Sequence, residues 1–157
     1  MEFPIFHGCF LPDQEEAAME YRKFGKHIVL RLDPGEEILT QLRVLAERED
    51  IRFAAVQGLG AVNDFTVGVF HTDTKVYESR RHQGAYEITS LTGTVDRMAG
   101  SFYAHLHFSA AGEDNTVLGG HLNEARISAT GELVLTLIDG ELDREKSPEV
   151  GLNLWKF

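Results

Sequence analysis

The sequence predicts an α+β fold, in which a mainly antiparallel β-sheet carries one principal packed helix. Apolar residues recur with a period of two at Ile28, Leu30 and Leu32, which is the pattern of a half-buried strand. Over residues 36–49 they recur at helical spacing and form one stripe on an otherwise charged segment. Beyond Asp50, short β-rich runs alternate with Gly, Asn and Asp turn signals, which favours an antiparallel sheet over a series of βαβ units.

The individual elements follow from these patterns in chain order. The helix has its apolar stripe at Ile38, Leu39, Leu42, Leu45 and Ala46, and we expect it to cover the sheet. The expected later strands cover residues 51–56, 65–70, 76–79, 86–95, 102–109, 117–118, 125–129, 133–138 and 152–157. Residues 57–62 contain only the G-x-G fragment of a phosphate loop and no helix follows them, so a tight turn is favoured over dinucleotide binding.

The length and composition predict one domain over residues 19–157, preceded by an N-terminal arm at residues 1–18. The chain has 157 residues, of which 43% are hydrophobic and 25% are charged, enough for one core. The N-terminus has neither a basic region nor an apolar stretch of the signal-peptide kind, and no later window resembles a membrane span. The single cysteine, Cys9, excludes an internal disulfide and favours a reducing compartment. We therefore expect a cytoplasmic protein with no membrane partner.

The charge of the chain argues against nucleic acid as a direct partner. Fifteen Lys and Arg stand against 25 Asp and Glu, which gives a formal net charge of -10. Such a surface repels phosphate backbones unless basic residues gather on one face. The densest basic cluster contains Arg80 and Arg81, with Lys75 before it. These three residues are the candidate nucleic-acid contacts, and a solvated loop is the alternative interpretation.

Three histidines and two glycines form the strongest candidate site. His105 and His107 are two residues apart on an expected strand, so their side chains leave the same face. A turn and a return strand after them would bring His121 alongside, and Gly119 and Gly120 would allow close backbone approach. Three neutral imidazoles around a tetrahedral ion leave one coordination position open. The alternative is that these histidines are polar-face residues or hydrogen-bonded core residues.

Other titratable residues are weaker candidates. Glu87 stands in a strand-forming segment, either as a surface residue or as a partner that orients one of the three histidines. The remaining histidines, His7, His27, His71 and His82, are scattered and are interpreted as ordinary surface or core residues.

Five short motifs occur in a fixed order: Arg31–Glu36 (RLDPGE), Gly58–Val62 (GLGAV), Tyr86–Gly93 (YEITSLTG), His105–His107 (HLH) and Gly119–Leu122 (GGHL). Together they resemble the plant and prokaryote conserved (PPC) domain, in its stand-alone prokaryotic form. The resemblance extends from about Met19 to Ile138.

The resemblance implies a homotrimer of α+β chains. It also implies that His105, His107 and His121 match positions at which prokaryotic members hold a metal, with zinc as the expected ion. In plants the domain accompanies an AT-hook, an Arg-Gly-Arg-Pro segment that enters the DNA minor groove, and mediates association with itself and with transcription factors. This chain contains no Arg-Gly-Arg-Pro, and Ala85 replaces the arginine of the plant motif Gly-Arg-Phe-Glu-Ile. Prokaryotic members are nevertheless often labelled as DNA-binding proteins.

Three hypotheses about function follow. The first is a trimeric binding or regulatory module with a three-histidine metal site, whose DNA-related role depends on a transcription-related protein partner. The second is a zinc-dependent enzyme that acts on an unknown small substrate, with Glu87 or Glu113 as its base. The third is direct DNA binding through Lys75, Arg80 and Arg81, concentrated by trimer symmetry.

Overall fold

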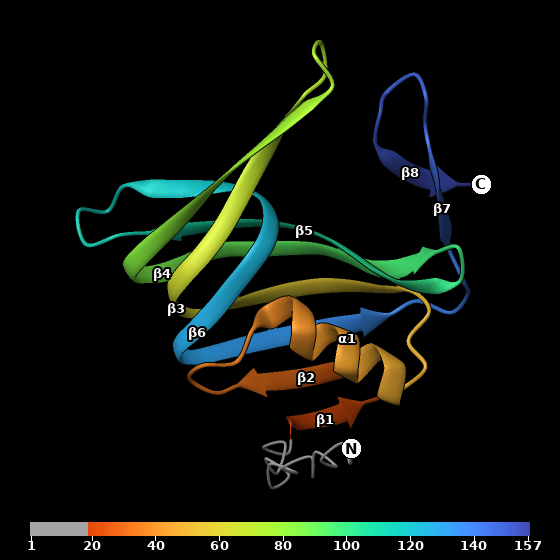
Figure 1. The fold of residues 1–157 in the computed structure, drawn as a ribbon. Coiled ribbons are helices and arrows are strands. Elements are labelled where there is room, and N and C mark those ends of the chain that lie inside the picture. The colour runs from red at the N-terminus through yellow and green to blue at the C-terminus, as the bar shows by residue number, and fades with distance from the viewer. Residues whose placement is uncertain (1–18) are drawn as a thin grey trace, which may run out of the picture.

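A computed structural model describes residues 19–157, so the arm expected at residues 1–18 lies outside the described residues. One helix and eight strands follow in chain order (Figure 1). They are β1 (Glu20–Phe24), β2 (His27–Leu32), α1 (Ile38–Arg48), β3 (Ala54–His71), β4 (Val76–Met98), β5 (Ser101–Ala111), β6 (Val117–Leu137), β7 (Asp143–Lys146) and β8 (Asn153–Lys156). Within residues 19–157, no helix has the length and apolarity that crossing a membrane requires.

Six strands form one antiparallel sheet in the order β1-β2-β6-β3-β4-β5. The long strand β6 pairs with β5 over residues 117–121, with β3 over residues 121–137 and with β2 over residues 131–136. The sheet therefore curls until β5 and β6 meet, while β7 and β8 form a separate hairpin (Figure 1). This architecture confirms the predicted α+β class with a mainly antiparallel sheet and one packed helix.

The helix covers one face of the sheet, as its apolar stripe predicted. Ile38, Leu42 and Leu45 are fully buried, together with Ile28 and Leu30 from β2. Each such side chain contributes about 1.5 to 3 kcal/mol of stabilisation relative to exposure. The N-terminus of the helix is capped as well. The carboxylate of Glu37 accepts hydrogen bonds from the backbone N–H groups of Leu39, Thr40 and Ala125, which joins the helix N-terminus to β6.

The strands are longer than the sequence pattern predicted. The expected strands at residues 51–56 and 65–70 are parts of β3, and the tight turn expected at residues 57–62 was wrong. Two register shifts, between Gly58 and Gly60 and between Val62 and Asp64, let β3 bend without ending. Similarly, residues 76–79 and 86–95 belong to β4, and three expected short strands belong to β6. Turn-forming residues here mark bulges and bends because strand pairing on both sides holds the backbone extended.

The face of the sheet opposite the helix, called here the open face, is uncharged over two cross-strand rows. Hydrogen-bonded neighbours define the rows His27-Thr136-Ala55-Thr94-His105 and Val29-Val134-Gln57-Thr92-His107. From β2 to β5 neither row contains Asp, Glu, Lys or Arg, although charged residues make up 25% of the chain; on β1, Arg22 pairs with Val29. Apolar side chains are exposed on this face, since Val29 is 42% exposed and Leu59 is 55% exposed. Both rows end at a histidine of β5.

The β7–β8 hairpin covers one end of the open face through a buried ion pair. Nε and Nη2 of Arg144 each donate to a different carboxylate oxygen of Asp96, both at 2.7 Å, and the two side chains are 4% and 0% exposed. Nε1 of Trp155 donates to the same carboxylate at 2.9 Å. The guanidinium also lies over the rings of Tyr103, at 4.8 Å, and Trp155, at 5.4 Å. Strand β4, strand β5 and the hairpin are therefore joined at one buried point.

The turn that connects β3 and β4, with its adjoining residues 68–79, projects from the sheet and is called here the β3–β4 arm (Figure 1). Its tip is fixed to the loop of the β7–β8 hairpin. Nζ of Lys75 donates to the backbone carbonyls of Glu149, at 2.7 Å, and Val150, at 3.0 Å. The arm is thus held at its tip as well as at its base.

Replacement of Asp96 by Ala should destabilise the protein by about 3 to 5 kcal/mol, because it leaves the Arg144 guanidinium buried without its counter-ion. Urea unfolding monitored by circular dichroism measures this loss. The matched control is Glu141→Ala, since that carboxylate contacts Arg52 but its side chain is 55% exposed. Its cost should stay below about 1 kcal/mol. Equal losses of unfolding free energy in the two variants would contradict the conclusion that the buried Asp96–Arg144 pair fixes the hairpin to the sheet.

Candidate metal centre

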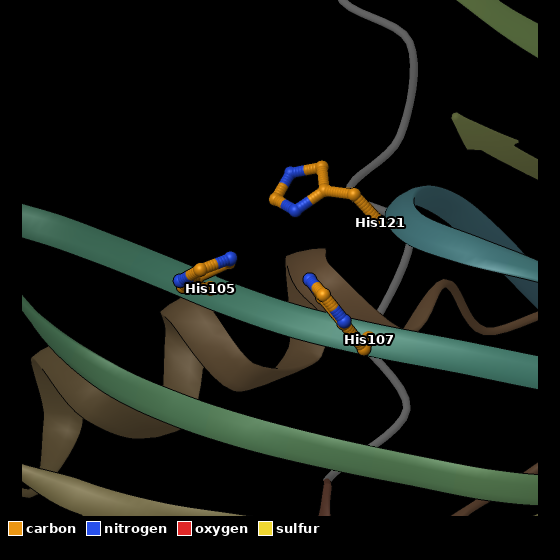
Figure 2. A group of neighbouring side chains, drawn as sticks. All are labelled: His105, His107 and His121. Carbon is orange, nitrogen blue, oxygen red and sulfur yellow. The ribbon is translucent and has the colours of Figure 1, made fainter. Parts of the chain in front are cut away.

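The three histidines predicted as a site face one another (Figure 2). His105 and His107 alternate with buried residues on β5 and therefore leave the same face of the strand. After the turn at residues 112–116, β6 returns and places His121 directly opposite His107. The return strand expected from the sequence thus supplies the third imidazole.

The distances fit a single ion held by three imidazoles. The candidate ligand nitrogens of His105, His107 and His121 all lie within 4.8 Å of one another. The ring centroids are separated by 5.3 Å (105–107), 5.2 Å (105–121) and 6.0 Å (107–121). Nitrogen ligands of a tetrahedral zinc ion stand about 3.3 Å apart, given Zn–N bonds of about 2.0 to 2.1 Å. Small side-chain rotations therefore suffice to bring the three nitrogens to an ion of this class.

His121 occupies the point at which β6 changes partners. It pairs with His107 on β5 and with Gly68 on β3. The preceding Gly120 is essential for this approach, because a Cβ atom there would lie 2.6 Å from the carbonyl oxygen of Gly68. A Cβ atom at Gly119 would similarly lie 2.6 Å from the carbonyl oxygen of Phe108. The two glycines thus serve the site by letting β6 fit between β5 and β3.

The surroundings keep two of the imidazoles neutral. Partial burial lowers the pKa of His105 from its ordinary value of 6.5, and the positive charge of Arg144 lowers it further. Partial burial also lowers the pKa of His121, with smaller contributions from His105 and His107. Neutral imidazole is the form that binds a metal ion. Both residues are therefore in the ligand form at neutral pH.

Two neighbours of the cluster could not be found from the sequence. Arg144 acts on His105 from the β7–β8 hairpin, far along the chain, and is itself held by Asp96. Tyr77 meets the ring of His121 edge-on, with centroids 6.0 Å apart. No local spacing signals either contact, because each depends on the pairing of distant strands. Exposed aromatic and charged residues near a turn look alike in the sequence whether or not they reach a site.

The structure does not bring Glu87 or Glu113 to the histidines. Glu87 pairs with Ala111, whereas His107 pairs with Thr92, five residues further along β4. This separation corresponds to roughly 15 Å along a strand. Glu113 lies in the β5–β6 turn, beside Tyr86 in a shallow depression of about 460 Å³. Within residues 19–157, the metal-ligand group contains the three histidines alone.

The candidate nucleic-acid contacts lie on β4 and the β3–β4 arm, and two of them have partners within the chain. Arg81 forms a two-pronged contact with the carboxylate of Asp64. Lys75 donates to the two backbone carbonyls described above. Arg80 is exposed, and because it adjoins Arg81 on a strand the two side chains leave opposite faces. The three residues therefore do not form one cationic surface.

Solved structures share this fold over nearly their whole length. A candidate DNA-binding protein from Bacteroides thetaiotaomicron is 29% identical, with a TM-score of 0.86, covering 88% of this chain and 97% of its own. A metal-containing protein from Archaeoglobus fulgidus is 31% identical, with a TM-score of 0.78, covering 89% and 99%. A plant- and prokaryote-conserved (PPC) protein from Pyrococcus horikoshii is 28% identical, with a TM-score of 0.77, covering 90% and 96%. No curated protein matches the chain.

The family model identifies the same family as the five sequence motifs and the fold. Residues 19–139 match the Plants and Prokaryotes Conserved (PCC) domain, so the match includes every one of the three histidines and leaves out the β7–β8 hairpin. The chain therefore belongs to the Plants and Prokaryotes Conserved domain family.

Proposed function

We propose that this protein is a homotrimeric binding module that holds a zinc-class ion at His105, His107 and His121. The convergence of three imidazoles on one point carries the proposal. A metal-containing relative with 31% identity supports it. In this proposal the module has a regulatory role and acts through its partners rather than by catalysis.

The ligand set suits binding better than turnover. When bound, an ion with three protein ligands offers a fourth position to water or a small ligand. An enzyme of this kind also needs a positioned base within hydrogen-bond reach of the reacting atoms. The two carboxylates expected for that role, Glu87 and Glu113, lie away from the cluster. Asp96, on the same face as His105, is already bound by Arg144 and Trp155.

The open face supports assembly with further copies of the chain. Depletion of charged residues with exposed apolar side chains is typical of the buried centre of an interface. The row through Val29 and Val134 has this composition, and both uncharged rows end at the histidines, whereas Leu59 lies in the next row, opposite Glu132. A second copy seated there would cover Val29 and Leu59 and would border the metal ligands. The trimer implied by the sequence motifs uses this face in our proposal.

A DNA-related role would then depend on a protein partner. Two structural relatives are described as candidate DNA-binding proteins, from Bacteroides thetaiotaomicron and from Ralstonia eutropha, the latter at 24% identity. In this chain the net charge is -10, and Arg81 and Lys75 are held by intramolecular contacts. An acidic surface of this kind favours contact with a protein over contact with a phosphate backbone.

Purification without chelator should yield about one zinc-class ion per chain, because three histidines form one ion site. Elemental analysis by mass spectrometry measures the content. His105→Ala should lower the metal content at least about tenfold, whereas His71→Ala should not change it, since His71 is 49% exposed and lies outside the cluster. A metal-free wild-type protein that also binds no added Zn²⁺ or Co²⁺ would contradict the proposal.

Gln57→Lys should convert the trimer into single chains, because it places a charge in the middle of the open face. Light scattering coupled to gel filtration measures the mass. The matched control is Gln41→Lys on the helix, on the opposite side of the sheet, which should leave the mass unchanged. If Gln57→Lys keeps the wild-type mass, the interface lies elsewhere.

The metal-free protein should lose stability as the pH falls below about 6.5. In the folded state the pKa values of His105 and His121 are lowered, so these two histidines stay neutral while the same histidines in the unfolded chain bind protons. Proton binding therefore favours the unfolded state. This loss of stability is absent well above pH 6.5 and reaches its full size below the folded-state pKa values of the two histidines. Urea unfolding in EDTA at several pH values measures it. The double variant His105→Gln, His121→Gln should show a smaller loss, and an unchanged loss would refute this explanation.

A further inference from the structure

The side chain of Tyr77 crosses over β3 at a glycine. Tyr77 lies on β4 opposite Phe70, while Gly68 is two residues away on β3 and pairs with His121 of β6. A Cβ atom on Gly68 would lie 2.4 Å from the Tyr77 hydroxyl oxygen and 2.5 Å from its Cζ atom. The tyrosine therefore occupies the space that any other residue at Gly68 would fill. The absence of a side chain at Gly68 is what lets the phenol of Tyr77 extend from the β3–β4 arm towards β6.

On β6 the phenol makes two contacts. Its ring meets the imidazole of His121 edge-on, with centroids 6.0 Å apart and an angle of 87°. Its hydroxyl donates a hydrogen bond to Oδ1 of Asn123 at 2.6 Å. Burial raises the pKa of Tyr77, so the hydroxyl stays protonated and remains a donor at neutral pH. The ring is thus held across β3 at Gly68, with its plane at 87° to the imidazole of one of the three candidate ligands.

The arm that carries Tyr77 is itself anchored. Lys75, two residues away, holds the carbonyls of Glu149 and Val150 on the β7–β8 hairpin. Phe70, opposite Tyr77, packs close to Gly151 in the same loop. Because the arm is fixed at both ends, the position of the phenol does not depend on the hydrogen bond to Asn123 alone.

We propose that Tyr77 is a positioning residue of the metal site, which holds the His121 imidazole in the orientation that directs its nitrogen towards His105 and His107. The inference rests on the proposed three-histidine metal site. Metal-binding histidines are usually oriented by a hydrogen bond to their second ring nitrogen. Among residues 19–157, the side-chain hydrogen bonds include none to these three imidazoles. His121 also follows two glycines, so the nearest residues on its own strand brace it little. The ring of Tyr77 supplies the missing constraint.

Co²⁺ binding to the purified protein tests the inference. Chelator competition gives the affinity, and the visible absorption of bound Co²⁺ reports the geometry of its ligands. Tyr77→Leu removes the aromatic edge and should weaken Co²⁺ binding by about 10-fold or more, the usual effect of losing a group that orients a ligand. Tyr77→Phe keeps the ring and should weaken binding far less, with the wild-type spectrum retained. Asn123→Ala should match Tyr77→Phe.

Val76→Ala is the matched control, because Val76 adjoins Tyr77 on the arm and is 49% exposed. Thermal unfolding of the metal-free variants separates loss of fold from loss of ligand orientation. Wild-type affinity and spectrum in a folded Tyr77→Leu protein would overturn the role of Tyr77 and leave the metal site intact. If wild-type protein itself binds no Co²⁺, the metal site fails and the role of Tyr77 fails with it. Weakened binding in Val76→Ala equal to that in Tyr77→Leu would also overturn it.

Discussion

The pairing of β6 with two strands at once is the constraint on which the site depends. At His121 the strand leaves β5 and joins β3, so this one residue faces His107 on one side and Gly68 on the other. The curl of the sheet is therefore what turns two histidines on a strand into three around a point. Close approach is possible because Gly119 and Gly120 present no Cβ atoms to the neighbouring backbones. Energetically the closure is part of the core, since the same strands bury apolar side chains beneath the histidines. A metal at this position would add a bond across the junction that strand pairing already makes.

The β7–β8 hairpin packs against the sheet beside the histidine cluster. It lies beyond the residues that match the family model, yet its Arg144 reaches Asp96 on β4, on the face that carries His105. A buried ion pair contributes little net stability, but breaking it is costly, so it fixes the hairpin in one position. Burial lowers the pKa of His105 most, the Arg144 guanidinium lowers it further, and Asp96 opposes part of this effect. Through Lys75 the hairpin also holds the arm from which Tyr77 extends. The hairpin therefore reaches the cluster at two points, through Arg144 beside His105 and through the arm that carries Tyr77 beside His121.

Local patterns in the sequence predicted the class of fold, the helix and the clustering of the three histidines, because those features depend on periods of two or of 3.6 residues. Alternation placed His105 and His107 on one face, and the turn after them made the return of His121 foreseeable. The patterns failed where pairing between distant strands overrides local propensity. Gly58 and Gly60 look like a turn but lie within β3, because neighbours on both edges hold the backbone extended. Tyr77 and Arg144 join the site through contacts that no spacing encodes. The candidate nucleic-acid contacts are close in the sequence, but in the fold Arg81 binds Asp64 and Lys75 binds the β7–β8 loop.

The place of the histidines at the end of the open face would link the proposed metal binding to the proposed assembly. The two uncharged rows run across the sheet to His105 and His107, so a copy of the chain that covers the rows would also border the ion. Coordination and subunit contact would then share residues, and each would favour the other by the reciprocity of linked equilibria. Such a design needs no catalytic base beside the ion, in keeping with the distance of Glu87 and Glu113 from the cluster. It does need imidazoles whose orientation is fixed before the ion binds, because a loosely held imidazole would weaken both metal coordination and subunit contact. In our proposal the contact between Tyr77 and His121 meets that need without adding a charge beside the two uncharged rows.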